Sequence, residues 1–378
     1  MDPVYLDHNA TTPLQPKVRE AMEPWLGELW GNPSSSHVYG RRAAVAVAEA
    51  RDAVAGLVGG SAESIVFTGG GTEADNLALR GPAVARRHIA LSAVEHPAVE
   101  LPSLRLVEEG WSRTVLPVDA AGRVALDEAR ELLAHQPGLL SVILAQNETG
   151  VIQPVAQLAA MAREAADDVV VHTDAAQAVG KIDVDVGSLG VDLMTIVSHK
   201  LYGPNGIGAL WVRPGLSLQP LTLGGGQEGG RRPGTEPVAL IVGFGAACAM
   251  AAADLAVEQQ RQAALRDRLW SALSTAIPTV VRTGAGALTL PNTLHVRFEG
   301  LVGAEILAAA DAVAAATGSA CHTDDAAPSG VLGAMGVGSA SARGAVRLSL
   351  GRRTTTENVD RAAAALVDAV QNAHNGAR

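Results

Sequence analysis

The sequence has little cysteine, no run of basic residues and no metal-binding spacing, and each absence argues against a class of protein. Two cysteines among 378 residues are too few for a disulfide framework and favour a reducing cytoplasm. The formal net charge is −10, so neither nucleic acid nor an anionic membrane is expected as the main partner. The ten histidines show no His-x3-His spacing and the cysteines no Cys-x2-Cys spacing, so no metal site is expected.

Targeting and membrane signals are also lacking. Residues 1–8 have neither the basic nor the apolar region of a signal peptide. One uncharged stretch, 237–253, is rich in Gly and Ala, but it is slightly short for a membrane span and a buried helix is the better interpretation. We therefore expect a soluble, cytoplasmic protein.

Short apolar runs alternate with Ala-rich stretches, which predicts an α/β fold. The expected buried strands are residues 64–68, 89–92, 140–145, 169–172, 193–197 and 209–212. The helix candidates between them include residues 40–58, 73–80 and 154–166. Because strands separated by helices pair in parallel, we expect a mainly parallel sheet flanked by helices.

The length exceeds what one hydrophobic core usually supports, so two domains are expected. From about residue 246 the pattern changes to a smaller α+β arrangement. Its expected elements are a long helix to about 277, strands at 294–298 and 345–350, a helix at about 356–373 and a tail from 372. We assign residues 13–245 to a large domain, and 1–12 with 246–378 to a small one.

Lys200 and Asp174 are the most informative residues of the chain. Lys200 follows an apolar strand and precedes a Gly-Pro turn, a place where a desolvated amine can form a Schiff base. Asp174 ends another apolar strand and is the type of group that keeps a pyridinium nitrogen protonated. Each alone is better explained as a surface lysine or an N-capping aspartate. The two together favour a pyridoxal phosphate (PLP) site.

A glycine-rich turn supplies a candidate phosphate site. The run TGGGT (68–72) follows an expected strand and opens an expected helix, and helix N-termini with exposed backbone amides favour anions. There is no Gly-Lys-Ser/Thr, so a nucleotide P-loop is not supported. Such a turn is often only a tight connection, but this one precedes the Asp174 and Lys200 segments in the same expected sheet.

Three further side chains, His96, Cys321 and Arg347, have both a functional and an ordinary interpretation. His96 follows a strand end and is either a ring-stacking proton carrier or a plain loop histidine. Cys248 lies in an apolar helix and is interpreted as inert core, whereas Cys321 lies in a polar stretch and is either a thiolate nucleophile or incidental. Arg347, within an apolar strand, needs a partner, which is either a substrate carboxylate or a structural ion pair.

Taken in order, these segments resemble the cysteine desulfurase/selenocysteine lyase family of the class V, fold-type I PLP enzymes. The resemblance runs almost from end to end. Its motifs are YLDHNATTP (5–13), GNPSS (31–35), GGTE (70–73), EH (95–96), NETG (147–150), HTDAAQ (172–177), HK (199–200), GGGQE (224–228), RPGTE (232–236), GSAC (318–321) and RLSLGR (347–352). So many ordered motifs leave little room for chance.

The resemblance implies a fold-type I architecture, a bound PLP and a role for each matching position around its ring. Lys200 would carry the Schiff base, and Asp174 would contact the pyridine nitrogen. Gln177 would bond the ring hydroxyl, and His96 would stack on the ring face.

The resemblance also implies which residues bind the phosphate of the cofactor. Gly71 and Thr72 of the glycine-rich turn would bind it together with His199. Thr235 would reach the phosphate of the other subunit in a homodimer.

For the substrate, the resemblance implies that Asn147 and Arg347 hold the carboxylate of L-cysteine or L-selenocysteine. Cys321 would be the nucleophile on a loop at about 318–335. The length of segment 321–332 resembles that of desulfurases which pass a persulfide to an acceptor protein.

The sequence departs from the pattern at Val197, where many desulfurases have a phosphate-binding serine; Ser198 is adjacent. The stretches at 195–200, 224–228 and 320–324 are closer to selenocysteine lyases.

Three enzymatic functions and one non-catalytic function are compared. A cysteine desulfurase, making L-alanine and a Cys321 persulfide, is favoured over a selenocysteine lyase. A class V aminotransferase would have no use for Cys321, and a non-catalytic sulfur carrier would not need Lys200 and Asp174. The acceptor could belong to iron–sulfur assembly, tRNA thiolation or thio-metabolite synthesis, and the sequence does not choose among them.

Overall fold

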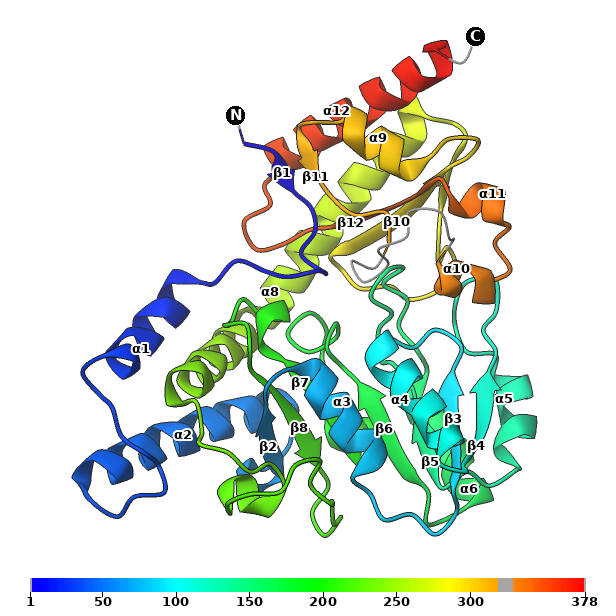
Figure 1. The fold of residues 1–378 in the computed structure, drawn as a ribbon. Coiled ribbons are helices and arrows are strands. Elements are labelled where there is room, and N and C mark those ends of the chain that lie inside the picture. The colour runs from blue at the N-terminus through cyan, green and yellow to red at the C-terminus, as the bar shows by residue number, and fades with distance from the viewer. Residues whose placement is uncertain (1, 319–328, 377–378) are drawn as a thin grey trace.

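The computed structural model describes residues 2–318 and 329–376. A seven-stranded sheet with the order β2-β8-β7-β6-β5-β3-β4 lies in the lower half of Figure 1. Strands β7, β6, β5, β3 and β4 pair in parallel, while β8 is antiparallel to β7 and β2. The strands are β2 (Ile65–Thr68), β3 (His88–Ser92), β4 (Ser112–Leu116), β5 (Leu139–Ser141), β6 (Val170–Asp174), β7 (Leu193–Val197) and β8 (Gly208–Val212). The expectation of a mainly parallel α/β sheet is confirmed.

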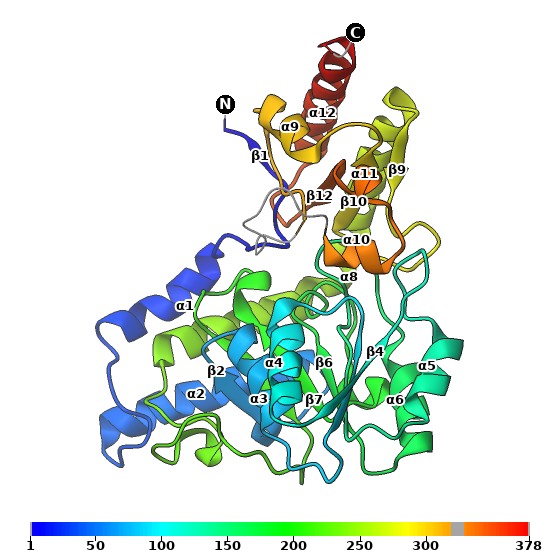
Figure 2. The ribbon, with the colours of Figure 1, turned by 45° about the vertical axis from the view of Figure 1, so that its right-hand side comes forward.

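Helices cover both faces of this sheet (Figures 1 and 2). Successive strand residues point to opposite faces, so Ile65 and Phe67 enter one core and Val66 the other. The Val66 face is covered by α3 (Gly71–Arg80) and α4 (Pro97–Glu108). The other is covered by α1 (Pro16–Leu26), α2 (Val38–Leu57), α5 (Leu126–Leu133), α6 (Val155–Ala165) and the start of α8 (Val238–Ala276). Burial on both faces explains why the inner strands β5, β7 and β8 are mainly apolar, whereas the edge strand β4 is more polar and more exposed.

A second, smaller core lies in the upper half of Figure 1. An antiparallel sheet of order β12-β10-β9 packs there with α9, α12 and the end of α8, and β1 pairs in parallel with β11. The elements are β1 (Val4–Tyr5), β9 (Val280–Arg282), β10 (Thr293–Phe298), α9 (Gly303–Ala309), β11 (Val313–Ala314), β12 (Ala345–Ser349) and α12 (Thr356–Gly376). The split into 13–245 and 1–12 with 246–378 stays a prediction.

Within residues 2–318 and 329–376, six shorter helical elements lie in the connections between these helices and strands. They are η1 (Ala62–Ser64), α7 (Val186–Leu189), η2 (Ser198–Lys200), η3 (Gln227–Gly230), α10 (Gly330–Ala334) and α11 (Ser339–Ala342).

Helix α8 begins before the predicted residue 246 and passes from one core into the other. Among the described residues it is the one helix that is long and apolar enough, by length and composition, to cross a membrane. Its first half is instead core: Phe244 and Cys248 have no exposed surface, and Gly245 packs directly on Ala50 of α2. The buried helix expected at 237–253 is confirmed. Burial raises the pKa of the Cys248 thiol, which agrees with an inert core residue.

Two predicted boundaries were wrong. The strand expected at 140–145 ends at Ser141. Val142 and Leu144 still donate backbone hydrogen bonds to β6, but on the other side β3 has already ended. The tail expected from 372 is helical to Gly376, because no helix breaker precedes that glycine and the buried Ala369 and Val370 anchor the preceding turn.

Candidate active site

The carboxyl ends of several strands meet at one edge of the large sheet. Asp174 is the last residue of β6, and Lys200 closes the turn η2 that follows β7. The glycine-rich turn follows β2, and His96 comes four residues after β3. In an α/β sheet this edge is where ligands bind, because helices begin and loops converge there.

A cavity of about 270 Å³ lies at this edge. Nine candidate site residues line it: Gly71, Thr72, His96, Asn147, Asp174, Gln177, His199, Lys200 and Arg347. Of the other two candidates, Thr235 is exposed and does not line this cavity. Cys321 lies outside the described residues.

Lys200 is held by the N-terminal segment. Its Nζ donates to the carbonyl oxygens of Asn9, at 2.5 Å, and Ala10, at 2.6 Å. Asn9 was not singled out as a site residue, although it lies within the motif at 5–13 that carries the resemblance. Only the folded chain brings it to a lysine 191 residues away.

Asp174 is an enclosed carboxylate facing a cavity with basic groups. Its Oδ1 accepts a hydrogen bond from the backbone N–H of Ala176 at 2.9 Å. Burial raises the pKa of Asp174, whereas His96, when it is protonated, and Lys200 lower it. A cation in the cavity would therefore stabilise its ionised form.

His96 is the N-cap of α4, and its Nδ1 accepts from the backbone N–H of Ala98 at 3.1 Å. Burial is the largest influence on its pKa and lowers it. An Nδ1 acceptor fixes the neutral tautomer with hydrogen on Nε2. His96 thus presents an N–H rather than a charge.

Glu95 is a buried acid that the sequence analysis did not single out. Burial raises its pKa to about 8, although its Oε1 accepts hydrogen bonds from Ile143 N–H, at 2.8 Å, and from the hydroxyl of Ser92. Its pKa in the unfolded chain is near 4.5. Between these values the folded state binds a proton that the unfolded state lacks, so stability falls as pH rises through this window.

Glu95→Gln is expected to remove this pH dependence. We expect the free energy of unfolding of the wild type to fall by about 2 kcal/mol more than that of the variant between pH 6 and pH 8. Urea unfolding of the cofactor-free proteins at both pH values measures the difference. An equal change in both proteins would mean that Glu95 is ionised in the fold.

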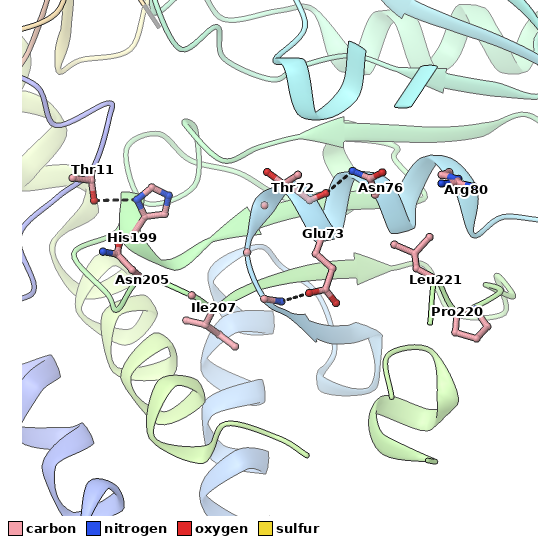
Figure 3. Close-up of a pocket in the computed structure, with 14 residues that line it drawn as sticks. Thr11, Thr72, Glu73, Asn76, Arg80, His199, Asn205, Ile207, Pro220 and Leu221 are labelled. Atoms are coloured by element: carbon pink, nitrogen blue, oxygen red, sulfur yellow. Dashed lines mark hydrogen bonds between the residues drawn. The ribbon is translucent and has the colours of Figure 1, made fainter. Parts of the chain in front are cut away.

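An anion cradle adjoins the cavity (Figure 3). A second pocket, of about 1030 Å³, is lined by Thr72 and the backbone of the glycine-rich turn at the N-terminus of α3. Gly70 has φ +147°, and a Cβ on Gly71 would lie 2.7 Å from Val197 Cγ2, so the turn needs glycine at both places. Backbone amides and the helix N-terminus make this pocket suitable for a phosphate.

His199 lines both pockets and adds a neutral donor. Its Nδ1 lies 3.1 Å from the hydroxyl of Thr11, a contact drawn in Figure 3. Burial, followed by the charges of Lys200 and Lys181, lowers its pKa to about 4. If Thr11 donates to Nδ1, the Nε2 hydrogen is available to an anion.

Ser198 does not supply the phosphate-binding hydroxyl that is missing at Val197. Ser198 is buried and lines neither pocket. Its Oγ lies toward Gly203, where a Cβ would come within 2.2 Å, and has no hydrogen-bond partner in the described part of the chain. Ser198 therefore does not take the place of a phosphate-binding serine at position 197.

Glu73 connects two of the sequence motifs, those at 70–73 and 232–236. Its Oε2 accepts from Gly69 N–H at 2.7 Å, and its Oε1 accepts from Arg232 Nε at 2.8 Å. The pair ties the glycine-rich turn to the segment that carries Thr235. Both residues were within quoted motifs but were given no role, because the contact spans 159 residues.

Arg347 has a structural partner and still faces the cavity. It is 1% exposed, and its Nη2 donates to Asp7 Oδ1 at 2.7 Å while its Nη1 donates to the carbonyl of Asn147 at 3.1 Å. The ion-pair interpretation is therefore confirmed. Its Nε has no hydrogen-bond partner among the described residues, which leaves a donor for a ligand carboxylate.

Comparison with known proteins agrees with this arrangement. The family model "Aminotransferase class-V" matches residues 4–362. The cysteine desulfurase IscS of Dictyoglomus turgidum is 42% identical over 363 residues, which are 94% of this chain and 92% of that protein. The chain belongs to the cysteine desulfurases of the class-V aminotransferase family.

Solved structures of this family share the fold. A NifS-like protein superposes with a TM-score of 0.92 at 33% identity, over 98% of this chain and all of that one. A structure titled "SspA in complex with cysteine" superposes with a TM-score of 0.80 at 32% identity, over 92% and 98% of the two chains. The fold-type I architecture expected from the resemblance is confirmed.

Proposed function

We propose that this protein is a PLP-dependent cysteine desulfurase that converts L-cysteine to L-alanine and leaves the sulfur as a persulfide on Cys321. The observation that carries the proposal is the meeting of Lys200 and Asp174 in one cavity, at the ends of adjacent strands and beside the glycine cradle. The family relationship and the cysteine-bound relative support the choice of substrate.

The lining fits PLP in its chemistry. An amine, a carboxylate and a neutral histidine surround a small cavity. This cavity adjoins the anion cradle at the N-terminus of α3, which suits a phosphate. Lys200, Asp174, Gln177 and His96 would hold the ring, and the glycine-rich turn would hold the phosphate. When bound, PLP supplies the carbonyl that binds the substrate amine and an electron sink for the carbanion at Cα.

The chain's own groups would position the substrate and move protons. Arg347 and Asn147 would orient the carboxylate, and the Lys200 amine would take the Cα proton and return it. The Cβ–S bond breaks as an S–S bond forms to Cys321, so L-cysteine and a thiol become L-alanine and a persulfide. Atoms and electrons balance without a further oxidant or reductant.

Exposed apolar side chains support the proposed homodimer. Trp30 is 66% exposed although it stacks on Tyr39 at 5.0 Å, and Leu223 is 93% exposed. Such residues commonly mark a protein interface. A second subunit would also give Thr235 a phosphate to reach. A sulfur-acceptor protein and a cytoplasmic location stay predictions.

The decisive measurement is alanine formation from L-cysteine and L-selenocysteine by the purified yellow protein. We expect turnover of both, with a persulfide trapped by alkylation on the wild type and absent from Cys321→Ser, whose cofactor absorbance is unchanged. Turnover of selenocysteine alone would assign the selenocysteine lyase function. Full cysteine turnover by Cys321→Ser would remove Cys321 from the mechanism.

A further inference from the structure

Lys181 is a second lysine beside the cavity and has no role in the mechanism above. The chain contains only three lysines among its 29 basic residues. Lys17 is exposed on α1, whereas Lys181 and Lys200 both reach the N-terminal segment at Asn9. Because the chain uses arginine for nearly all of its basic residues, we infer that a lysine at this internal position is present for the chemistry of its amine.

The Lys181 amino group lies inside the protein, although the residue is partly exposed. Its Nζ donates to Gln177 Oε1 at 2.6 Å and to Asn9 Oδ1 at 3.1 Å. Burial lowers the pKa of Lys181 well below its usual range, and the charges of Lys200 and Arg347 lower it further. No carboxylate bonds to it in the described part of the chain, so both of its hydrogen bonds go to side-chain amides.

The partners of these amides are fixed. Asn9 Nδ2 donates to the carbonyl of Asn147, at 3.2 Å, and to Thr293 Oγ1, at 2.9 Å, which leaves its oxygen facing Lys181. Gln177 Nε2 donates to the Asn9 carbonyl at 2.9 Å. The hydrogen bonds therefore hold both amide groups in one orientation.

This arrangement decides which atom Gln177 offers to the cavity. A backbone carbonyl can only accept, so the Gln177 nitrogen must face the Asn9 carbonyl, and the Gln177 oxygen then faces Lys181, which donates to it. The amide nitrogen carries two hydrogens, and the Asn9 carbonyl takes one. Because Gln177 lines the cavity, the second N–H is available to a ligand there.

We propose that Lys181 is a positioning residue that holds the Gln177 amide so that an N–H, and not the oxygen, meets an anionic ring oxygen of the cofactor. The inference rests on the proposed function, because PLP supplies that oxygen. Without Lys181 the Gln177 oxygen loses its donor, and only the bond to the Asn9 carbonyl opposes a turn of the amide that would aim this oxygen at the anion. A donor stabilises the ionised ring oxygen, so its loss raises the pH at which the bound cofactor titrates.

The test is a pH titration of the visible absorbance of four holoenzymes: the wild type, Lys181→Met, Gln177→Leu and the double variant. We expect both single variants to raise the midpoint by about one pH unit, as the loss of one hydrogen bond to a charged group predicts. The double variant should shift no further than Gln177→Leu alone. Lys17→Met, a matched loss of a lysine charge at the surface, should titrate like the wild type.

The double variant separates positioning from simple charge. Lys181 also lies near the charged groups of Lys200 and Arg347, and it contributes to the lowered pKa values of His8 and His199. If Lys181→Met gave the same additional shift in the Gln177→Leu background, Lys181 would act through its charge and the proposal would be wrong. An unchanged midpoint in Lys181→Met alone would also overturn it.

If Lys181→Met does not fold, a second variant, Lys181→Gln, tests the same inference. Lys181→Gln retains an N–H donor toward Gln177, so we expect a smaller shift than that of Gln177→Leu; an equal or larger shift contradicts the inference. A wild-type protein with no visible cofactor band would contradict the proposed function. A wild type that has the band while the variants titrate unchanged contradicts this inference alone.

Discussion

Replacing Lys200 with alanine is expected to lower the rate of alanine formation from L-cysteine at least about 10³-fold, because the residue would supply both the covalent attachment and the proton transfer at Cα. Its Nζ already lies at the cavity, between the carbonyls of Asn9 and Ala10. None of the other groups that line the cavity is an amine: His96 is an imidazole and Arg347 a guanidinium.

Two variants identify the reason for that loss. Lys200→Arg keeps a positive charge but cannot release a proton near neutral pH, so it should be about as inactive as Lys200→Ala. Lys17→Ala, on the exposed side of α1, should retain wild-type turnover. Initial rates of alanine formation, with thermal unfolding to confirm the fold, measure the series. Activity of Lys200→Ala within tenfold of the wild type would refute the assigned role.

The sheet and the strand-end residues were predictable because local patterns encode them. The strand at 193–197 was predicted to the residue, since it is buried on both faces and ends at a polar turn. The carboxyl ends of neighbouring parallel strands lie at the same edge of a sheet. Asp174 and Lys200 could therefore be expected in one site from the sequence alone. The resemblance added roles that periodicity alone does not give.

What the sequence could not predict depends on contacts between distant segments. Nothing local indicates that Asn9 accepts from Lys200 and from Lys181, or that Glu73 pairs with Arg232. The large and small cores are likewise joined by one uninterrupted helix, α8, where a change in composition predicted a boundary. Local patterns locate elements, whereas hydrogen-bond partners follow from packing.

The structure also changes what a mutation of Arg347 would mean. This arginine pairs with Asp7 and with the carbonyl of Asn147, so its removal disturbs the protein as well as the substrate site. Truncating one partner of a buried charged hydrogen bond costs about 2–5 kcal/mol. A loss of activity in one variant would therefore not distinguish substrate binding from structure.

A pair of variants makes that distinction. For Arg347→Leu we expect kcat/KM for L-cysteine to fall about 10²- to 10³-fold, mainly through a higher KM, because the carboxylate loses a charge-assisted hydrogen bond that is present before and during the reaction. Asp7→Asn removes the structural ion pair but leaves the arginine in the cavity, so its KM should stay within about fivefold of the wild type. Steady-state kinetics and urea unfolding of both variants provide the comparison. Equal KM values for the two variants would assign Arg347 a structural role and leave the substrate carboxylate to Asn147.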